Sequence, residues 1–157
     1  MHFARIAKLA FVAGAAIAAH PINAAPTIYG TYYDETVGAS CGSALYCQAG
    51  FAQLPSNKLL KVRKVNCRFL ADKAVTAASL YVATDSNCTN ILAHNLQLPL
   101  PIATSTSQSG QGFLTIESDT QWLIGQGRYP FIGANTIASG QIGLSCTLIG
   151  ELIDPIQ

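Results

Sequence analysis

Residues 141–152 read QIGLSCTLIGEL, and they carry the clearest secondary-structure signal in the chain. Apolar side chains alternate there with small or polar ones, at Ile142, Leu144, Cys146, Leu148 and Leu152. This period of two is typical of a strand that buries one face. We therefore predict a core strand in which Cys146 points inward.

A second stretch, LLKVRKVNCRFL at residues 59–70, shows the same alternation with one slip. The apolar positions are Leu60 and Val62 before the slip, and Val65, Cys67 and Phe69 after it. The phase changes at Arg63–Lys64. A β-bulge, which is one extra residue in a strand, would keep both apolar sets on the core side. Cys67 is therefore also predicted to point inward.

The rest of the sequence repeats this pattern of short apolar runs. Runs rich in Val, Ile, Leu, Thr, Tyr and Phe alternate with clusters of Gly, Pro, Asn, Asp and Ser, which is the pattern of an all-β domain. The expected strands lie at 27–33, 45–53, 59–70, 75–84, 91–98, 112–118, 120–125, 128–133 and 140–152. Eight or nine short strands predict a single-domain antiparallel β-sandwich or a jelly-roll-like fold. The polar segment 99–112 is long for a turn and is predicted to be a mobile loop.

The N-terminal residues have the three parts of a secretory signal. Two basic residues form a positive head, residues 9–19 form an apolar run too short to span a bilayer comfortably, and Ala24 is a small residue at the cleavage position. We predict a signal peptide at 1–24, cut after Ala24 or one residue later. A buried N-terminal helix or a retained anchor is the alternative. The mature domain, 25–157, has no second apolar span, which predicts a secreted or periplasmic protein without a membrane span.

All five cysteines lie in the mature part, at Cys41, Cys47, Cys67, Cys88 and Cys146. Disulfides persist outside the reducing cytosol, so export favours two bridges and one thiol left over. Sequence alone does not fix the pairing. Two inward cysteines favour a Cys67–Cys146 bridge, and the short spacing of Cys41 and Cys47 favours a local loop, which leaves Cys88 free. A bridge between Cys67 and Cys88 is the alternative.

The charge balance excludes one class of partner. The chain has nine Lys or Arg and eight Asp or Glu, and two of the basic residues lie in the predicted leader. The mature part is therefore close to neutral, with a formal charge of minus one. It lacks the positive field of a typical nucleic-acid-binding protein, so no nucleic-acid partner is predicted.

Residues suited to catalysis are few. His94 is the one histidine left after cleavage and has no nucleophile motif around it, so neither a catalytic triad nor a histidine-rich zinc site is expected. We expect His94 to face solvent on a strand. Two carboxylate pairs, Asp34–Glu35 and Glu117–Asp119, are candidates for glycoside hydrolysis, which uses two such groups at one bond. This reading is the weaker one, because both pairs lie at expected turns.

The segment TDSN at residues 84–87 also has a local explanation. Its oxygen-bearing side chains resemble calcium ligands, but no EF-hand pattern surrounds them, and turn chemistry accounts for them better. Asn87 begins an NCT glycosylation sequon. The chain has no glycine-rich nucleotide-binding motif, and we predict neither a metal nor a cofactor.

A cluster of basic residues forms the first candidate binding surface. Six of the seven mature basic residues fall within sixteen positions, at Lys58, Lys61, Arg63, Lys64, Arg68 and Lys73. Alternation on the strand 59–70 places Lys61, Arg63 or Lys64, and Arg68 on the outward face together. This basic stripe is a candidate site for an acidic polysaccharide or an acidic protein partner. The alternative is the solvated face of a sheet, where lysines prevent edge-to-edge aggregation.

Aromatic side chains form the second candidate surface. They are Tyr29, Tyr32, Tyr33, Tyr46, Trp122, Tyr129 and Phe131. Flat rings stack on sugars, but Tyr and Trp are also ordinary strand and core residues, and core packing is expected for most of them. Tyr32 and Tyr33 are the candidate binding residues of this group.

These observations predict a small exported, non-enzymatic β-sandwich. Its expected ligand is a glycan, a polyanion or a protein partner in the bacterial envelope or medium. The chain is 50% hydrophobic and only 11% charged, and a surface poor in charge suits a protein that packs beside copies of itself. A self-assembling, homo-oligomeric surface protein is therefore the alternative, and a secreted glycoside hydrolase is the weaker alternative.

Overall fold

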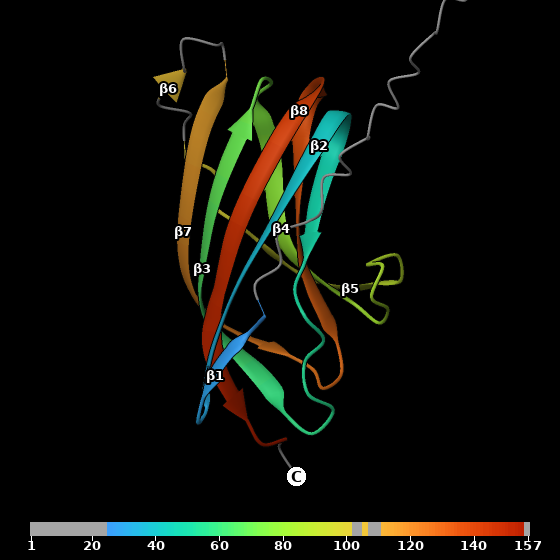
Figure 1. The fold of residues 1–157 in the computed structure, drawn as a ribbon, viewed down its shortest axis with the longest axis vertical. Helices are drawn as coiled ribbons and strands as arrows, with labels where there is room; N and C mark the ends of the chain where they lie inside the picture. The colour runs from blue at the N-terminus through green and yellow to red at the C-terminus, as the bar shows by residue number, and fades with distance from the viewer. Residues whose placement is uncertain (1–24, 102–104, 107–110, 156–157) are drawn as a thin grey trace, which may run out of the picture.

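The computed structural model describes residues 25–101, 105–106 and 111–155, which form strands and no helix (Figure 1). The strands are β1 (Thr27–Tyr29), β2 (Tyr32–Gly50), β3 (Leu59–Ala71), β4 (Val75–Ala83), β5 (Ile91–Gln97), β6 (Ser105–Thr106), β7 (Gly112–Ile124) and β8 (Tyr129–Ile153). Every pairing among these strands is antiparallel. The prediction of an all-β antiparallel domain is confirmed.

Two predictions fall wholly or partly outside the described residues. The signal peptide at 1–24 lies outside them, and the mobile loop at 99–112 is described only at its ends and at β6. The part of the chain that the structure describes holds no helix long and apolar enough to cross a membrane.

The two longest strands, β2 and β8, pair with each other, and both bend sharply at the same point along their length. Residues 32–41 of β2 pair with 142–151 of β8, and residues 46–50 of β2 pair with 131–135 of β8. The register slips between these two blocks, and Ser43 has a positive φ of 50° there. The sheet therefore folds back on itself at this point, at the upper end of the molecule in Figure 1.

The fold-over divides the sheet into two arms. The front arm has the strand order β1, the first part of β2, the last part of β8, β3, β7 and β6. The rear arm consists of the last part of β2, the first part of β8, β4 and β5. The loop 51–58 crosses from the rear arm to the front arm at the end opposite the fold-over.

The apolar faces of both arms meet in one core. Its members come from the front arm, the rear arm and the crossover loop, and include Val37, Phe51, Leu54, Val65, Phe69, Leu80, Ile116, Ile132, Ala134, Ile142 and Leu148. Each Leu, Ile or Phe side chain removed from water contributes about 1.5–3 kcal/mol. Burial of these alternating positions is the main reason that the arms stay together.

The predicted β-bulge in β3 is present. The register of β3 with both β7 and β8 shifts between Val62 and Lys64, so Arg63 is the extra residue. The apolar positions before and after the shift are all buried, while Arg63 and Lys64 are both partly exposed. The bulge thus keeps one apolar face continuous across the slip in the sequence pattern.

Two disulfides hold the sheet, in agreement with the pairings favoured from the sequence. Cys67 and Cys146 are direct partners in the β3–β8 register, with a Cα–Cα distance of 4.1 Å. Cys41 and Cys47 stand on either side of the fold-over, with an S–S distance of 2.02 Å, and tie the two arms together there. Cys88 is free and buried.

The sequence missed one long stretch of strand. Residues 34–44 lie between the strands expected at 27–33 and 45–53. They instead continue β2, and the long-range pairing with β8 keeps them extended as far as the fold-over. Conversely, the two strands expected at 128–133 and 140–152 are the two ends of β8.

Candidate functional site

The basic stripe lies on the outer face of the front arm, where carboxylates from neighbouring strands face it. Lys58 Nζ lies 2.6 Å from Asp154 Oδ1, and Arg63 Nη2 lies 3.2 Å from Glu151 Oε2. Lys64 is paired with Glu117 and lies 3.7 Å from Asp119 Oδ1. The Glu117 carboxylate raises the pKa of Lys64. Arg68 lies over the ring of Phe113, 5.2 Å from its centroid.

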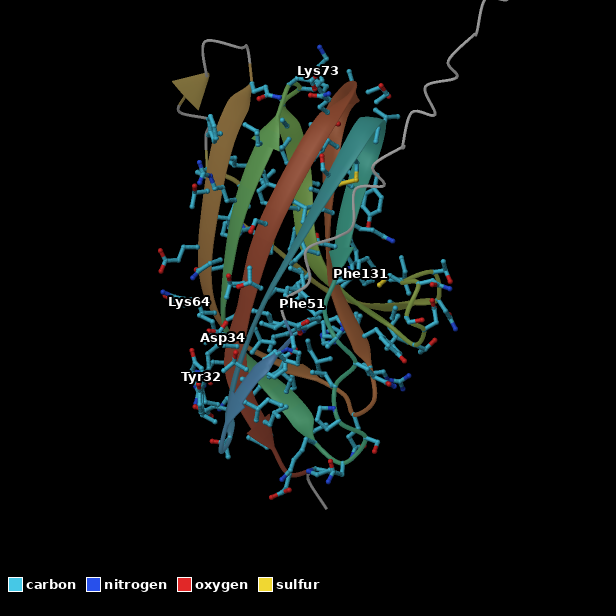
Figure 2. All side chains as sticks on the ribbon, in the orientation of Figure 1. Tyr32, Asp34, Phe51, Lys64, Lys73 and Phe131 are labelled. Carbon is cyan, nitrogen blue, oxygen red and sulfur yellow. A yellow bond between two sulfur atoms is a disulfide. The ribbon has the colours of Figure 1, made fainter. Side chains whose placement is uncertain are left out.

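Three of the six basic residues, Lys58, Arg63 and Lys64, are therefore paired with carboxylates of the same chain. Among the described residues, Lys61, Arg68 and Lys73 take part in no ion pair. Figure 2 shows that Lys73 lies near the fold-over, far along the molecule from Lys64. A polyanion would thus meet alternating charges of both signs rather than a concentrated positive patch, which favours the solvated-face interpretation of the stripe.

The predicted carboxylate pairs are not arranged for acid–base catalysis. Asp34 and Glu35 are consecutive strand residues, so they point to opposite faces of β2. Glu117 and Asp119 share the outer face of β7, but both are exposed and lie beside Lys64. Neither pair lines the cleft that the described residues form beside β2.

Glu35 instead joins β2 to the crossover loop. Its side chain is only 3% exposed, and the buried Tyr33 hydroxyl donates a hydrogen bond to Oε2. Glu35 Oε1 accepts the backbone N–H of Ala52 at 2.8 Å. Burial raises the pKa of Glu35, although both hydrogen bonds act in the opposite direction. Tyr33, expected to be a surface residue for ligands, is therefore a buried structural residue.

The loop 84–90 is closed by Asp85 through turn chemistry, as the sequence indicated. Asp85 Oδ2 accepts the N–H of Asn90 at 2.6 Å, and Oδ1 accepts the N–H groups of Asn87 and Thr89. These hydrogen bonds lower the pKa of Asp85, and the bond from the Asn90 N–H makes the largest contribution. The carboxylate is occupied by its own loop, so it is not arranged as a calcium ligand.

An open cleft of about 420 Å³ lies where this loop meets β2. Its walls come from both parts of β2, the start of the crossover loop, the loop 84–90 and the first residue of β8. The lining residues are Gly38, Ala39, Gln48, Ala49, Gly50, Phe51, Ala52, Gln53, Ser86, Asn87, Cys88 and Tyr129. Its volume falls within the range of small-molecule sites, and no charged side chain lines it.

Amide and hydroxyl groups supply the polar part of the cleft, whose other lining side chains are apolar. The Tyr46 hydroxyl donates to Gln48 Oε1 at 3.2 Å, and no described residue accepts a hydrogen bond from Gln48 Nε2. Gln53 Nε2 donates to the carbonyl of Gly127 at 3.0 Å. Each amide thus has one end fixed, which holds it in position and leaves hydrogen-bonding capacity at the other end. Burial raises the pKa of the Cys88 thiol, which keeps it neutral in the cleft wall.

The aromatic residues do not form one surface. Tyr29 and Tyr32 are exposed at the β1–β2 hairpin, 74% and 42% respectively. On the rear arm, the rings of Tyr81 and Phe131 stack 5.1 Å apart beside Tyr129 and Cys88. Figure 2 places Phe131 on this arm, away from Tyr32.

Trp122 and His94 form a separate contact between the two arms. Trp122 Nε1 on β7 donates to His94 Nε2 on β5 at 2.7 Å, and the ring centroids are 4.7 Å apart. His94 is exposed, as expected, but it also links the outermost long strand of the front arm to that of the rear arm.

The cleft was not predicted from the sequence. It joins residues near 38, 50, 87 and 129, which no local pattern brings together. One sequence signal did mark part of it: residues 36–50 contain neither a charged residue nor a proline. In comparisons with known proteins, no protein-family model and no curated protein matches this chain.

Proposed function

We propose that this chain is an exported, non-enzymatic β-sandwich that binds a neutral glycan in the cleft beside β2. The observation that carries the proposal is the lining of the cleft, which combines amides, hydroxyls and backbone with apolar side chains and the rings of Phe51 and Tyr129, without any charged side chain. Neutral sugars present many hydroxyl groups that both donate and accept hydrogen bonds. Amide side chains and backbone groups of this kind are suitable partners for them.

The electrostatics of the outer face support a neutral ligand over a polyanion. Lys58, Arg63 and Lys64 already have carboxylate partners, so an acidic polymer would have to compete with them. The cleft contains no side chain with positive charge. A neutral polysaccharide of the cell envelope or of the medium is therefore the ligand class that fits best.

The proposed location and architecture rest on other features. Two disulfides fit an oxidising compartment, and export through the leader at 1–24 would deliver the chain there. The fold-over brings two antiparallel arms around one core, and this arrangement supports a sandwich description.

The test is a binding screen with defined oligosaccharides. The purified protein is titrated calorimetrically with neutral cello-, manno- and chito-oligosaccharides and with acidic oligogalacturonate. We expect saturable binding of at least one neutral series and none of the acidic one. Gln48→Leu should weaken binding about tenfold, because a ligand hydroxyl would lose its partner in a partly desolvated site.

Gln121→Leu is the matched control, because it makes the same change on an exposed β7 position outside the cleft. Binding that Gln48→Leu leaves unchanged would place the ligand elsewhere. Salt-sensitive retention on immobilised acidic polysaccharide, lost when Lys61, Arg63 and Lys64 are all changed to Ser, would instead establish the basic stripe as the binding surface.

A further inference from the structure

The front edge of β2 is open over a short and well-defined window. β1 covers β2 only from Tyr32 to Asp34, and the described residues place no other strand on that side. The fold-over ends the straight part of β2 after Cys41. Residues 35–41 therefore form a seven-residue edge whose outward backbone groups lack a strand partner among the described residues.

This edge has little of the usual protection against pairing with another strand. Natural sheets protect exposed edges with charged residues, proline, bulges or very short strands. The window contains no proline and no bulge, since Asp34 to Cys41 pair with β8 in unbroken register. Its one charged residue, Glu35, points into the core and is held there by Tyr33 and Ala52. This inward carboxylate is the one protective feature of the window, and it leaves the outer face without charge.

The window is also complementary to itself. Its midpoint is Gly38. A two-fold axis at Gly38 would place each residue of one copy opposite the residue of the second copy that lies equally far beyond the midpoint. On the outer face Thr36 would then lie opposite Ser40 of a second copy, and both side chains are exposed. On the inner face Val37 would lie opposite Ala39. Hydroxyl pairs of this kind are favourable across antiparallel strands, and no like charges meet.

The two ends of the window are compatible with the same arrangement. In this register Cys41 of the second copy would lie opposite Glu35, immediately before the position where β1 begins. The second copy turns away there, because its own fold-over starts at Gly42 and Ser43. The incoming strand therefore ends where β1 occupies the edge.

We propose that two copies of this chain associate through antiparallel pairing of residues 35–41, with Gly38 on the two-fold axis. The front arms then form one continuous sheet across the dimer. The interface is isologous, as in most homodimers, and its backbone hydrogen bonds satisfy the open edge of each copy. The inference is argued from the open edge and not from a ligand, although Gly38 and Ala39 belong both to this window and to the lining of the cleft.

The test compares charge pairs at the two outer-face positions. Sedimentation velocity is measured over a concentration series for the wild-type protein with both disulfides intact. We expect reversible dimerisation of the wild type. Thr36→Lys combined with Ser40→Lys places lysines opposite each other twice in the dimer, and should weaken association about tenfold or more.

A charge-swapped variant fixes the register. Thr36→Lys combined with Ser40→Asp keeps the same lysine but places it opposite an aspartate, and should restore dimerisation to about the wild-type level. Both variants lose the Thr36–Thr147 hydroxyl contact, so a folding defect would affect them equally. A wild-type protein that stays monomeric at all concentrations would overturn the proposal, as would equal association of the two variants.

Discussion

The folded sheet has two open sides, and they differ in chemistry. On one side β2 forms the edge of both arms, the Cys41–Cys47 disulfide ties the arms at the fold-over, and the cleft opens beside it. On the other side β7 and β5 are the outer long strands. They are linked by the Trp122–His94 contact, and β7 carries Glu117 and Asp119.

The edge at β7 is protected against pairing with another strand, whereas the edge at β2 is open. Charged residues on β7 oppose the approach of another strand, and β6 also covers one end of it. Residues 36–50 of β2 have no charge at all, and burial of Glu35 removes the nearest one from the surface. The charge pattern thus indicates that β2 is the side available for a ligand or a second copy.

The largest effect is expected from the disulfides. Loop-closure entropy grows with the length of the closed loop, so Cys67–Cys146, with a separation of 79 residues, should stabilise more than Cys41–Cys47, with a separation of 6. We expect losses of about 4 and about 2 kcal/mol for the respective double alanine variants, measured by urea unfolding. Equal losses would show that the fold-over depends on its short disulfide far more than chain entropy accounts for.

The Cys67–Cys146 disulfide was accessible to sequence reasoning for a specific reason, whereas Cys41–Cys47 was favoured only by the short spacing of the two cysteines. The inward direction of Cys67 and Cys146 follows from period-two alternation within a single strand, and the bulge at Arg63 follows from a break in the same pattern. Such signals are local. The burial of Tyr33 and Glu35 is not local, because it depends on the crossover loop passing over β2 and bringing Ala52 to the carboxylate.

The charge pattern around the stripe shows the same limit. The sequence predicts that Lys61, either Arg63 or Lys64, and Arg68 share the outward face of β3, and in the sheet these residues are all at least partly exposed. The sequence pattern does not show that Glu117 on β7 and Glu151 on β8, both distant in the chain, lie beside these basic residues. The net charge of a surface patch depends on which strands lie side by side, and this strand order is set by long-range contacts.

A smaller effect is expected at the Trp122–His94 contact. Trp122→Phe keeps an aromatic ring but removes the N–H donor, and should lower the free energy of unfolding by about 1 kcal/mol. His94→Ala should remove the same hydrogen bond, so the double variant should be less destabilised than the sum of the two. Full additivity in thermal or urea unfolding would show that the two rings act independently. Neither change should alter dimerisation through β2.

A pH-dependent effect is expected on the β2 side. The folded-state pKa of Glu35 is raised by burial, so the protonated form favours folding, and this contribution is lost as pH rises through the folded-state pKa. Between mildly acidic and neutral pH the wild type should therefore lose stability relative to Glu35→Gln, which cannot ionise. Urea midpoints across this range measure the difference. If the wild type instead lost stability relative to Glu35→Gln towards acidic pH, the hydrogen bonds from Tyr33 and Ala52 would have a larger effect on the pKa of Glu35 than burial has.

The smallest effect on stability, and the most direct test of the comparison, is expected on β7. Glu117→Thr combined with Asp119→Thr makes the β7 edge as free of charge as the β2 edge, while Thr keeps a high strand propensity. The two carboxylates are exposed and their pairs with Lys64 are on the surface, so the unfolding midpoint should not change measurably. If charge is what keeps this edge from pairing, the variant should form assemblies larger than a dimer in sedimentation velocity, since each copy then has two open edges. A variant that associates no more than the wild type would show that β6 and the twist of β7 protect the edge without the charges, and the contrast between the two sides would then be one of shape.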